Sequence, residues 1–124
     1  ITQAVTKGIR GDRPMKDSGI EWIGEIPAEW KVNLIKNVAT TGSGGTPESG
    51  NPSLYDGDIN WICSYDLKER PITKSERRLT QLGADSIAGN VQLKGSVLVA
   101  MYGGSGTIGN SGILECEAKT NQAI

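Results

Sequence analysis

The chain has 124 residues, of which 13 are lysine or arginine and 14 are aspartate or glutamate, so its formal net charge is −1. This length fits one domain that buries a core without disulfides or metal. The charge excludes a basic surface over the whole chain, so a nucleic-acid surface must be local or shared with a partner.

The absence of histidine removes the commonest general base and every Ser-His or Cys-His nucleophile. The two cysteines, Cys63 and Cys116, have no CxxC spacing, which predicts neither a zinc site nor a disulfide framework. We expect both to be small buried side chains in a reducing compartment. With no signal-peptide pattern and no apolar run near the ~20 residues of a membrane span, we expect a cytoplasmic protein.

Residues 1–7 are followed by Gly8, which predicts the last turns of a helix closed by that glycine. Seven residues do not form a stable helix by themselves, so we expect this helix to begin upstream. In residues 22–30, Trp22 and Trp30 stand among apolar neighbours and are predicted to anchor the segment against the core.

The apolar residues Val32, Leu34 and Val38 predict a further strand. Residues 42–53 are rich in glycine and also hold two prolines, which predicts a loop, either flexible or used for binding.

Asp56 and Gly57 form a turn signal. Residues 59–63 then predict a strand that ends in the polar residues 64–66. Trp61 lies inside this strand and is assigned to the core.

Basic residues cluster in residues 68–78, where Lys68, Arg70, Lys74, Arg77 and Arg78 stand against Glu69 and Glu76. A solvated loop is the simplest interpretation of such a run, and a local nucleic-acid surface is the alternative. Residues 80–87 predict a short helix interrupted by Gly83.

Residues 97–102 form a continuous apolar run bounded by Gly95 and Gly103, which predicts a strand buried on both faces. Five glycines follow in residues 103–112, before an apolar-rich strand in residues 113–118. The glycines spell G-x-G-x-x-G and nearly a P-loop, but Asn110 replaces the lysine that reaches the phosphates. Because no helix is predicted to follow, we favour a tight strand-to-strand connection over a nucleotide site.

Taken together, several segments in this order resemble the specificity subunit of type I restriction-modification enzymes. They are MKDSGIEWIGEIPAEW (15–30), GGTP (44–47), Tyr55 with GDINW (57–61), Asp66, KGSVLVAMYG (94–103), TIG (107–109) and Asn121-Gln122. The resemblance implies that residues 1–14 are the end of a spacer helix and a linker. Residues 15–124 would then be a target recognition domain, incomplete at its carboxyl terminus.

The resemblance implies an α+β fold, with a curved mixed or antiparallel sheet and short helices. It also implies a non-catalytic subunit that recognises double-stranded DNA in a sequence-specific manner. Methyltransferase (modification) subunits and a restriction subunit would be the partners, and S-adenosylmethionine, ATP and Mg²⁺ would bind only to them. This chain would therefore hold no cofactor and no metal.

Residues of three kinds are predicted to face DNA. Hydroxyls of the 42–53 loop suit phosphate contact, short polar side chains after the 59–63 strand suit base edges, and basic side chains hold phosphate. In chain order the predicted DNA-binding residues are Ser43, Thr46, Ser49, Asn60, Ser64, Tyr65, Asp66, Lys68, Arg70, Lys74, Tyr102, Ser105 and Gln122. Ordinary turn and cap roles are the alternative for these side chains.

Two competing functions stay open. One is a nucleotide-binding enzyme that uses the glycines of residues 103–112, and the other is a folded fragment without DNA binding of its own. Because the recognition domain of the family continues past Asn121-Gln122, we also expect an uncovered sheet and self-association of the fragment.

Overall fold

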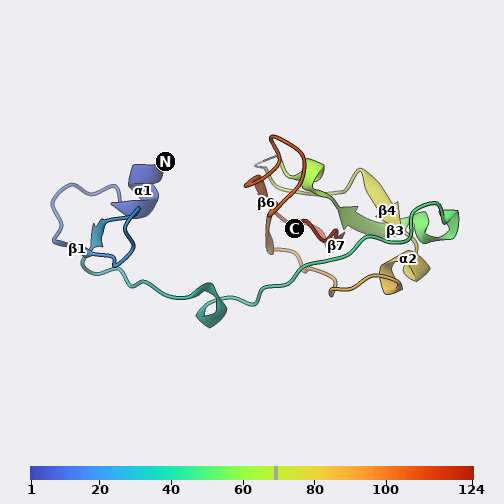
Figure 1. Ribbon diagram of the computed structural model, residues 1–124, viewed down its shortest axis with the longest axis horizontal. Coiled ribbons are helices and arrows are strands. Elements are labelled where there is room, and N and C mark those ends of the chain that lie inside the picture. Colours follow the sequence, from blue (N-terminus) through green and yellow to red (C-terminus); the bar gives the residue numbers. More distant parts are fainter. Residues whose placement is uncertain (69) are drawn as a thin grey trace. The chain divides into compact units, whose positions relative to one another are not determined.

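The computed structural model describes residues 1–68 and 70–124, and it divides into two compact units, Ile1–Thr41 and Gly42–Ile124 (Figure 1). Glu69, which the sequence places in the basic segment, lies outside the described residues. Short helices and three small sheets, of which one is mixed and two are antiparallel, confirm the α+β class.

The first unit contains the predicted helix and a hairpin that the sequence did not indicate. Helix α1 (Thr2–Thr6) is followed by Gly8 at φ 77°, a left-handed conformation that suits glycine after a helix. Strands β1 (Met15–Asp17) and β2 (Glu25–Pro27) pair antiparallel, with Met15 opposite Pro27. Each strand has three residues, too few for an alternating pattern to stand out.

Two sequence expectations about the first unit are wrong. The segment with Val32, Leu34 and Val38 is no strand: it contains a 3₁₀ turn, η1 (Ile35–Asn37), and these three side chains are 53%, 61% and 69% exposed. Trp22 is 79% exposed and Trp30 is only half-buried. A hairpin of two three-residue strands has too little surface to cover both indoles and the following apolar residues.

The second unit is built on a mixed three-stranded sheet in the order β4–β3–β7. Strand β3 (Tyr55–Ile62) pairs antiparallel with β4 (Arg77–Leu79) and parallel with β7 (Lys119–Thr120). The predicted strand at 59–63 is confirmed, and it begins earlier than expected, directly after the 3₁₀ turn η2 (Pro52–Leu54).

The turn expected at Asp56-Gly57 is instead a bulge within β3. The pairing register shifts between Tyr55 and Ile59, and Asp56 has a φ of 60°. A Cβ on Gly57 would lie 2.5 Å from the carbonyl oxygen of Leu79, so glycine allows β4 to approach here.

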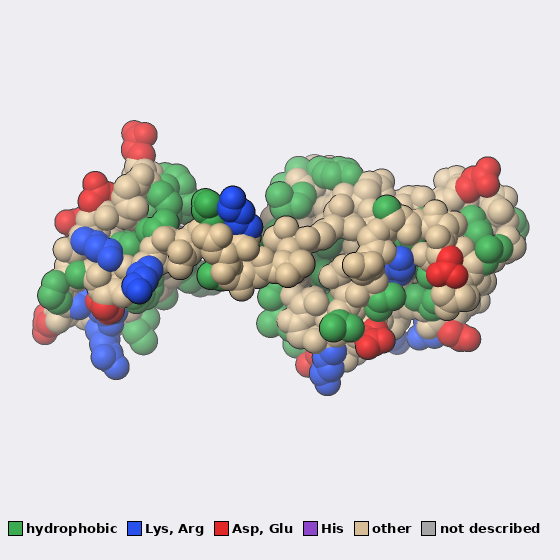
Figure 2. All heavy atoms as spheres, turned by 90° about the horizontal axis from the view of Figure 1, so that it is seen from below, with side chains coloured by type: hydrophobic (Ala, Val, Ile, Leu, Met, Phe, Trp, Pro, Cys, Tyr) green, Lys and Arg blue, Asp and Glu red, His purple; other side chains and the backbone are tan. Residues whose placement is uncertain are grey.

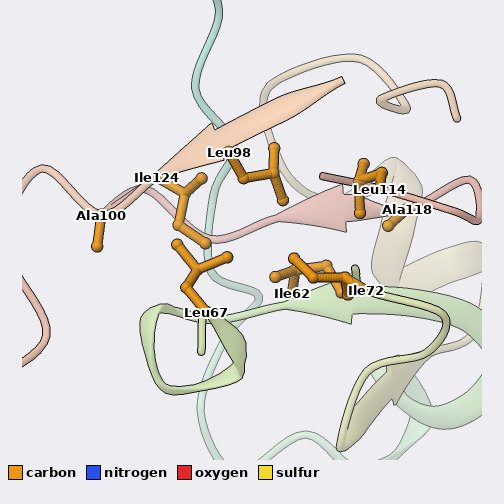
Figure 3. Packing of buried hydrophobic residues seen from close by; sticks show 8 residues of the cluster. All are labelled: Ile62, Leu67, Ile72, Leu98, Ala100, Leu114, Ala118 and Ile124. Carbon is orange, nitrogen blue, oxygen red and sulfur yellow. The ribbon is translucent and has the colours of Figure 1, made fainter. Parts of the chain in front are cut away.

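Strand β3 separates two hydrophobic clusters, because successive side chains of a strand point to opposite faces. Trp61 and Cys63 pack on one face, with Leu79 and Ile87. Ile62 points to the other face, into a cluster formed by Leu67, Ile72, Leu98, Ala100, Leu114, Ala118 and Ile124 (Figure 3). Buried Trp61 and Cys63 are therefore confirmed, whereas Cys116 is only half-buried.

Helix α2 (Gln81–Asp85) lies within the helix predicted for residues 80–87 and has a polar cap at Thr80. The Thr80 hydroxyl accepts a hydrogen bond from the backbone N–H of Gly83 at 3.0 Å. Gly83 is buried, and a Cβ there would lie 1.9 Å from the carbonyl oxygen of Leu54. This glycine therefore brings the helix close to η2 and does not interrupt it.

Strands β5 (Val97–Val99) and β6 (Ser111–Ile113) form an antiparallel hairpin. The expectation of a strand buried on both faces is wrong, since Leu98 is buried while Val97 and Val99 are 66% and 40% exposed. The glycines connect one strand to the next, which confirms the connection that the sequence favoured over a nucleotide loop. Among the described residues, no helix has the length and apolar character needed to cross a membrane.

Candidate nucleic-acid interface

The topology of the second unit collects polar residues at one edge of its sheet. Because β3 and β7 run parallel, with Trp61 opposite Lys119, their carboxyl ends lie at the same edge. The 3₁₀ turn η3 (Ser64–Asp66) follows β3 there, and Gln122 follows β7. The predicted residues of both segments therefore lie at one edge, which we call the β3/β7 edge.

The loop with Thr46 is attached to the same edge. The Thr46 hydroxyl donates a hydrogen bond to Oε1 of Gln122, and the backbone N–H of Gly45 donates to the carbonyl of Thr120 at 3.0 Å. The indole N–H of Trp61 donates to the carbonyl of Gly45 at 3.1 Å. Contacts to a strand end and to a core indole fix this loop, so it is not the flexible connection that the sequence left open.

The glycine-rich connection also lies beside this edge. Asn110 donates from Nδ2 to the carbonyl of Leu67 at 3.2 Å, which places the connection against the residue after η3. The backbone N–H of Met101 donates to the carbonyl of Ala123 at 2.8 Å. Tyr102 and Ser105, both exposed, are thereby brought near the segments that carry Ser64 and Gln122.

The basic segment is held by a buried residue at its centre. Ile72 is 4% exposed and forms a parallel bridge with Leu114, through hydrogen bonds of 2.8 Å and 2.9 Å to Ile113 and Glu115. Lys68, Arg70 and Lys74 around it line an open surface hollow of about 770 Å³. The backbone of the segment is therefore docked beside β6, while its lysine and arginine side chains remain exposed.

Charge in this hollow is mixed but mainly basic. Glu76 pairs with Lys68 at 3.4 Å, and both side chains are at least half-exposed, so the pair adds little stability. Arg78 of the basic cluster also lines the hollow, although it is not among the predicted DNA-binding residues. The face of the unit seen in Figure 2 shows acidic and basic side chains interspersed.

Two predicted base-reading side chains are engaged inside the protein. The Asp66 carboxylate accepts backbone N–H bonds from Cys63 at 2.8 Å and from Glu76 at 3.2 Å. Asn60 donates to the carbonyl of Glu117 at 3.2 Å and accepts from Ser75. In this structure both side chains attach the basic segment to the end of β3 and to η3, Asn60 through Ser75 and Asp66 through Glu76.

Two further predicted residues, Ser43 and Ser49, are exposed and lie elsewhere in the 42–53 loop. The carbonyl of Ser43 packs against Gly89, and Ser49 lies in the stretch that leads to η2 and the amino end of β3. The structure thus places the basic segment beside Tyr65 and Asp66 and leaves Ser49 apart from the other predicted residues. The residues that it brings together are Thr46, Ser64, Tyr65, Tyr102, Ser105 and Gln122.

Sequence reasoning placed Arg77 in the basic cluster but not among the predicted DNA-binding residues. Its guanidinium carbon lies 4.9 Å from the Tyr55 ring centre and 5.0 Å from that of Trp61. Arg77 and Trp61 are paired across β4 and β3. The available signal was the alternation within β4, which places Arg77 on the same face of the sheet as Trp61 and Arg78 on the other.

Burial dominates the titration of the groups near η3. It raises the pKa of the Cys63 thiol, and a hydrogen bond with Tyr65 opposes the rise. Burial also raises the pKa of Tyr65, and the hydrogen bond with Cys63 is the second cause of this rise. Burial likewise raises the pKa of Cys116. Both thiols are therefore protonated at neutral pH.

We expect both cysteines to react slowly with iodoacetamide at pH 8 in the native protein, because thiolate is the reactive form. In 6 M guanidinium chloride both should be alkylated at the rate of an ordinary thiol. Mass spectrometry over a time course measures the two rates. Fast alkylation of native Cys63 would show that η3 opens readily and does not hold a fixed edge.

Comparison with known proteins relates the chain to a restriction enzyme subunit. No protein-family model matches the chain. Over 105 residues, 82% of its length, the chain is 30% identical to the type I restriction enzyme MjaIX specificity subunit of Methanocaldococcus jannaschii. The chain covers 24% of that protein, about a quarter of its length. This similarity confirms the resemblance that the ordered motifs predicted.

Proposed function

The chain is a relative of type I restriction enzyme specificity subunits, and from that premise we propose that it is part of a domain that recognises DNA. In this proposal it reads one portion of a target sequence for a restriction-modification complex. Adenine methylation and cleavage are carried out by other subunits. The relative's name as a specificity subunit supports this split of roles.

The observation that carries the proposal is the convergence of donors at the β3/β7 edge. Hydroxyl and amide side chains lie at the edge, and cationic side chains surround the adjacent hollow. Phosphate contacts position a protein on a duplex, while neutral polar groups and arginine read base edges. A fixed edge beside a local basic surface supplies both kinds of contact.

The proposal places S-adenosylmethionine, ATP and Mg²⁺ on modification and restriction subunits. Among residues 1–68 and 70–124, no group of three or more Cys, Asp or Glu side chains is arranged to hold a metal ion. The glycine-rich connection leads into strand β6, whereas nucleotide loops of this kind lead into a helix. The nucleotide-binding alternative therefore has no structural support in this loop.

The test is a fluorescence titration of duplex DNA carrying a randomised segment, repeated across a series of salt concentrations. We expect the logarithm of the binding constant to fall linearly with the logarithm of the salt concentration. Replacing Lys68, Arg70 and Lys74 together by alanine should weaken binding to all sequences. The salt slope should fall by about 0.9 for each phosphate that these side chains no longer neutralise, and so by up to ~2.7.

A matched control removes the same charge elsewhere. Lys31, Lys36 and Lys94 are exposed and lie outside the hollow, and their joint replacement by alanine should leave the slope nearly unchanged. Equal slopes for the two triple variants would show that the basic segment makes no specific contribution. Absence of any binding by the unmodified chain would contradict the proposed function itself.

A further inference from the structure

The guanidinium of Arg77 is held against two aromatic rings. Its carbon lies 4.9 Å from the ring centre of Tyr55 and 5.0 Å from that of Trp61. The two rings contact each other edge to face, with centroids 6.1 Å apart and planes at 63°. An arginine attracted to two ring faces loses much of the freedom that an exposed side chain has.

The rings themselves are fixed by the loop that carries Thr46. Trp61 is 2% exposed and donates its indole N–H to the carbonyl of Gly45 at 3.1 Å. Tyr55 donates its hydroxyl to the carbonyl of Pro47 at 3.0 Å. The orientation of Arg77 is therefore set by the same segment that bonds Gln122 at the β3/β7 edge.

The hydrogen-bonding groups of Arg77 are available for a ligand. Arg77 is exposed, and among the described residues its side chain makes no hydrogen bond and no salt bridge. Arg13 shows the contrasting case, because its guanidinium pairs with Glu29 at 2.7 Å. An arginine kept in place by aromatic rings retains its donors for an acceptor outside the protein.

The position of Arg77 is close to the candidate interface. Arg77 pairs with Trp61 across β4 and β3, and Trp61 stands two residues before Cys63, where β3 leads into η3. Arg77 also follows Glu76, which lines the basic hollow. It therefore lies where the basic segment meets the rings that the loop with Thr46 holds.

We propose that Arg77 is a specificity-determining residue that contacts a guanine in the major groove through two parallel hydrogen bonds. This inference rests on the proposed function. A planar guanidinium matches the O6 and N7 acceptors of guanine, which is the commonest specific arginine contact with DNA. A base edge must be contacted from one direction, so a guanidinium with a fixed orientation suits it. The surrounding lysines neutralise the phosphate charge, which does not need that orientation.

The experiment selects bound duplexes from a pool with a randomised segment and sequences them, for the unmodified chain and for Arg77→Lys. The unmodified chain should enrich a motif with at least one strongly preferred G·C pair. Lysine keeps the charge and its attraction to the rings but lacks the fork. Arg77→Lys should lower the preference at that one pair by about 5- to 150-fold and leave the other positions unchanged.

A second variant, Arg77→Met, separates base contact from phosphate contact. It should show the same loss of guanine preference, with apolar packing against the rings retained. If Arg77 contacts only phosphate, Arg77→Lys will keep the motif. Arg77→Met will then weaken all sequences alike, with a salt slope lower by about 0.9, and the inference is overturned.

Controls distinguish the remaining outcomes. Arg10 is exposed in the first unit, and Arg10→Lys should leave the selected motif unchanged. Circular dichroism melting verifies that each variant is folded at the temperature of selection. A motif identical for the unmodified chain and Arg77→Lys overturns this inference alone, while no enrichment by the unmodified chain overturns the proposed function together with it.

Discussion

Replacing Gly44 by alanine is expected to destabilise the second unit by about 3 kcal/mol or more. A Cβ at this position would lie 1.8 Å from the carbonyl oxygen of Thr120 and 2.5 Å from its hydroxyl oxygen. Thr120 is 2% exposed within β7, so neither backbone can move without disturbing the sheet. A destabilisation of this size is a large part of the roughly 5–15 kcal/mol that holds a typical domain folded.

Urea unfolding followed by far-ultraviolet circular dichroism measures this destabilisation. Gly104→Ala is the matched control, because nothing lies within 4 Å of a Cβ there and its φ is outside the left-handed region. We expect this control to change the free energy of unfolding by less than about 0.5 kcal/mol. Equal stabilities for the two variants would mean that residues 43–46 are not docked on β7.

Truncating Trp61 to alanine should cost about 3–5 kcal/mol, the range for a large aromatic residue removed from a core. Trp61 is 2% exposed and belongs to the cluster with Cys63, Leu79 and Ile87. Trp61→Phe keeps most of the volume but removes the indole donor to Gly45. Its cost should be about 1–3 kcal/mol if that carbonyl is left without a partner.

Trp22→Ala provides the control for the removal of an indole, since Trp22 is 79% exposed. It should change the free energy of unfolding by less than about 0.5 kcal/mol. The same urea titration by circular dichroism compares the three variants without relying on tryptophan fluorescence. A Trp61→Ala variant as stable as Trp22→Ala would contradict the packing of β3 between two clusters.

Local signals in the sequence predicted the elements that local chemistry defines. Gly8 closes α1 and located that helix, and Thr80, which caps α2, is the first residue of the helix predicted for residues 80–87. The run at residues 97–102 was misjudged, because apolar character alone does not say which side chains a neighbouring segment covers. Val97 and Val99 point away from the core that Leu98 enters.

The candidate interface was only partly accessible from sequence for the same reason. The basic run is visible in the sequence, but its attachment through Ile72 depends on Leu114, which is remote along the chain. The internal hydrogen bonds of Asn60 and Asp66 depend on Glu117 and Glu76 in the same way. The position of Arg77 over two rings required the register between β3 and β4.

The parallel pairing of β3 with β7 has a consequence for the order of folding. Trp61 lies opposite Lys119, so this pairing closes a long loop, whereas β3 and β4 are close along the chain. Non-local pairings carry a larger loop-closure cost and form late. During synthesis, a nascent chain can form the β3–β4 hairpin before residues 119–122 leave the ribosome. The edge that collects Thr46, Ser64 and Gln122 is completed only afterwards, when β7 pairs with β3.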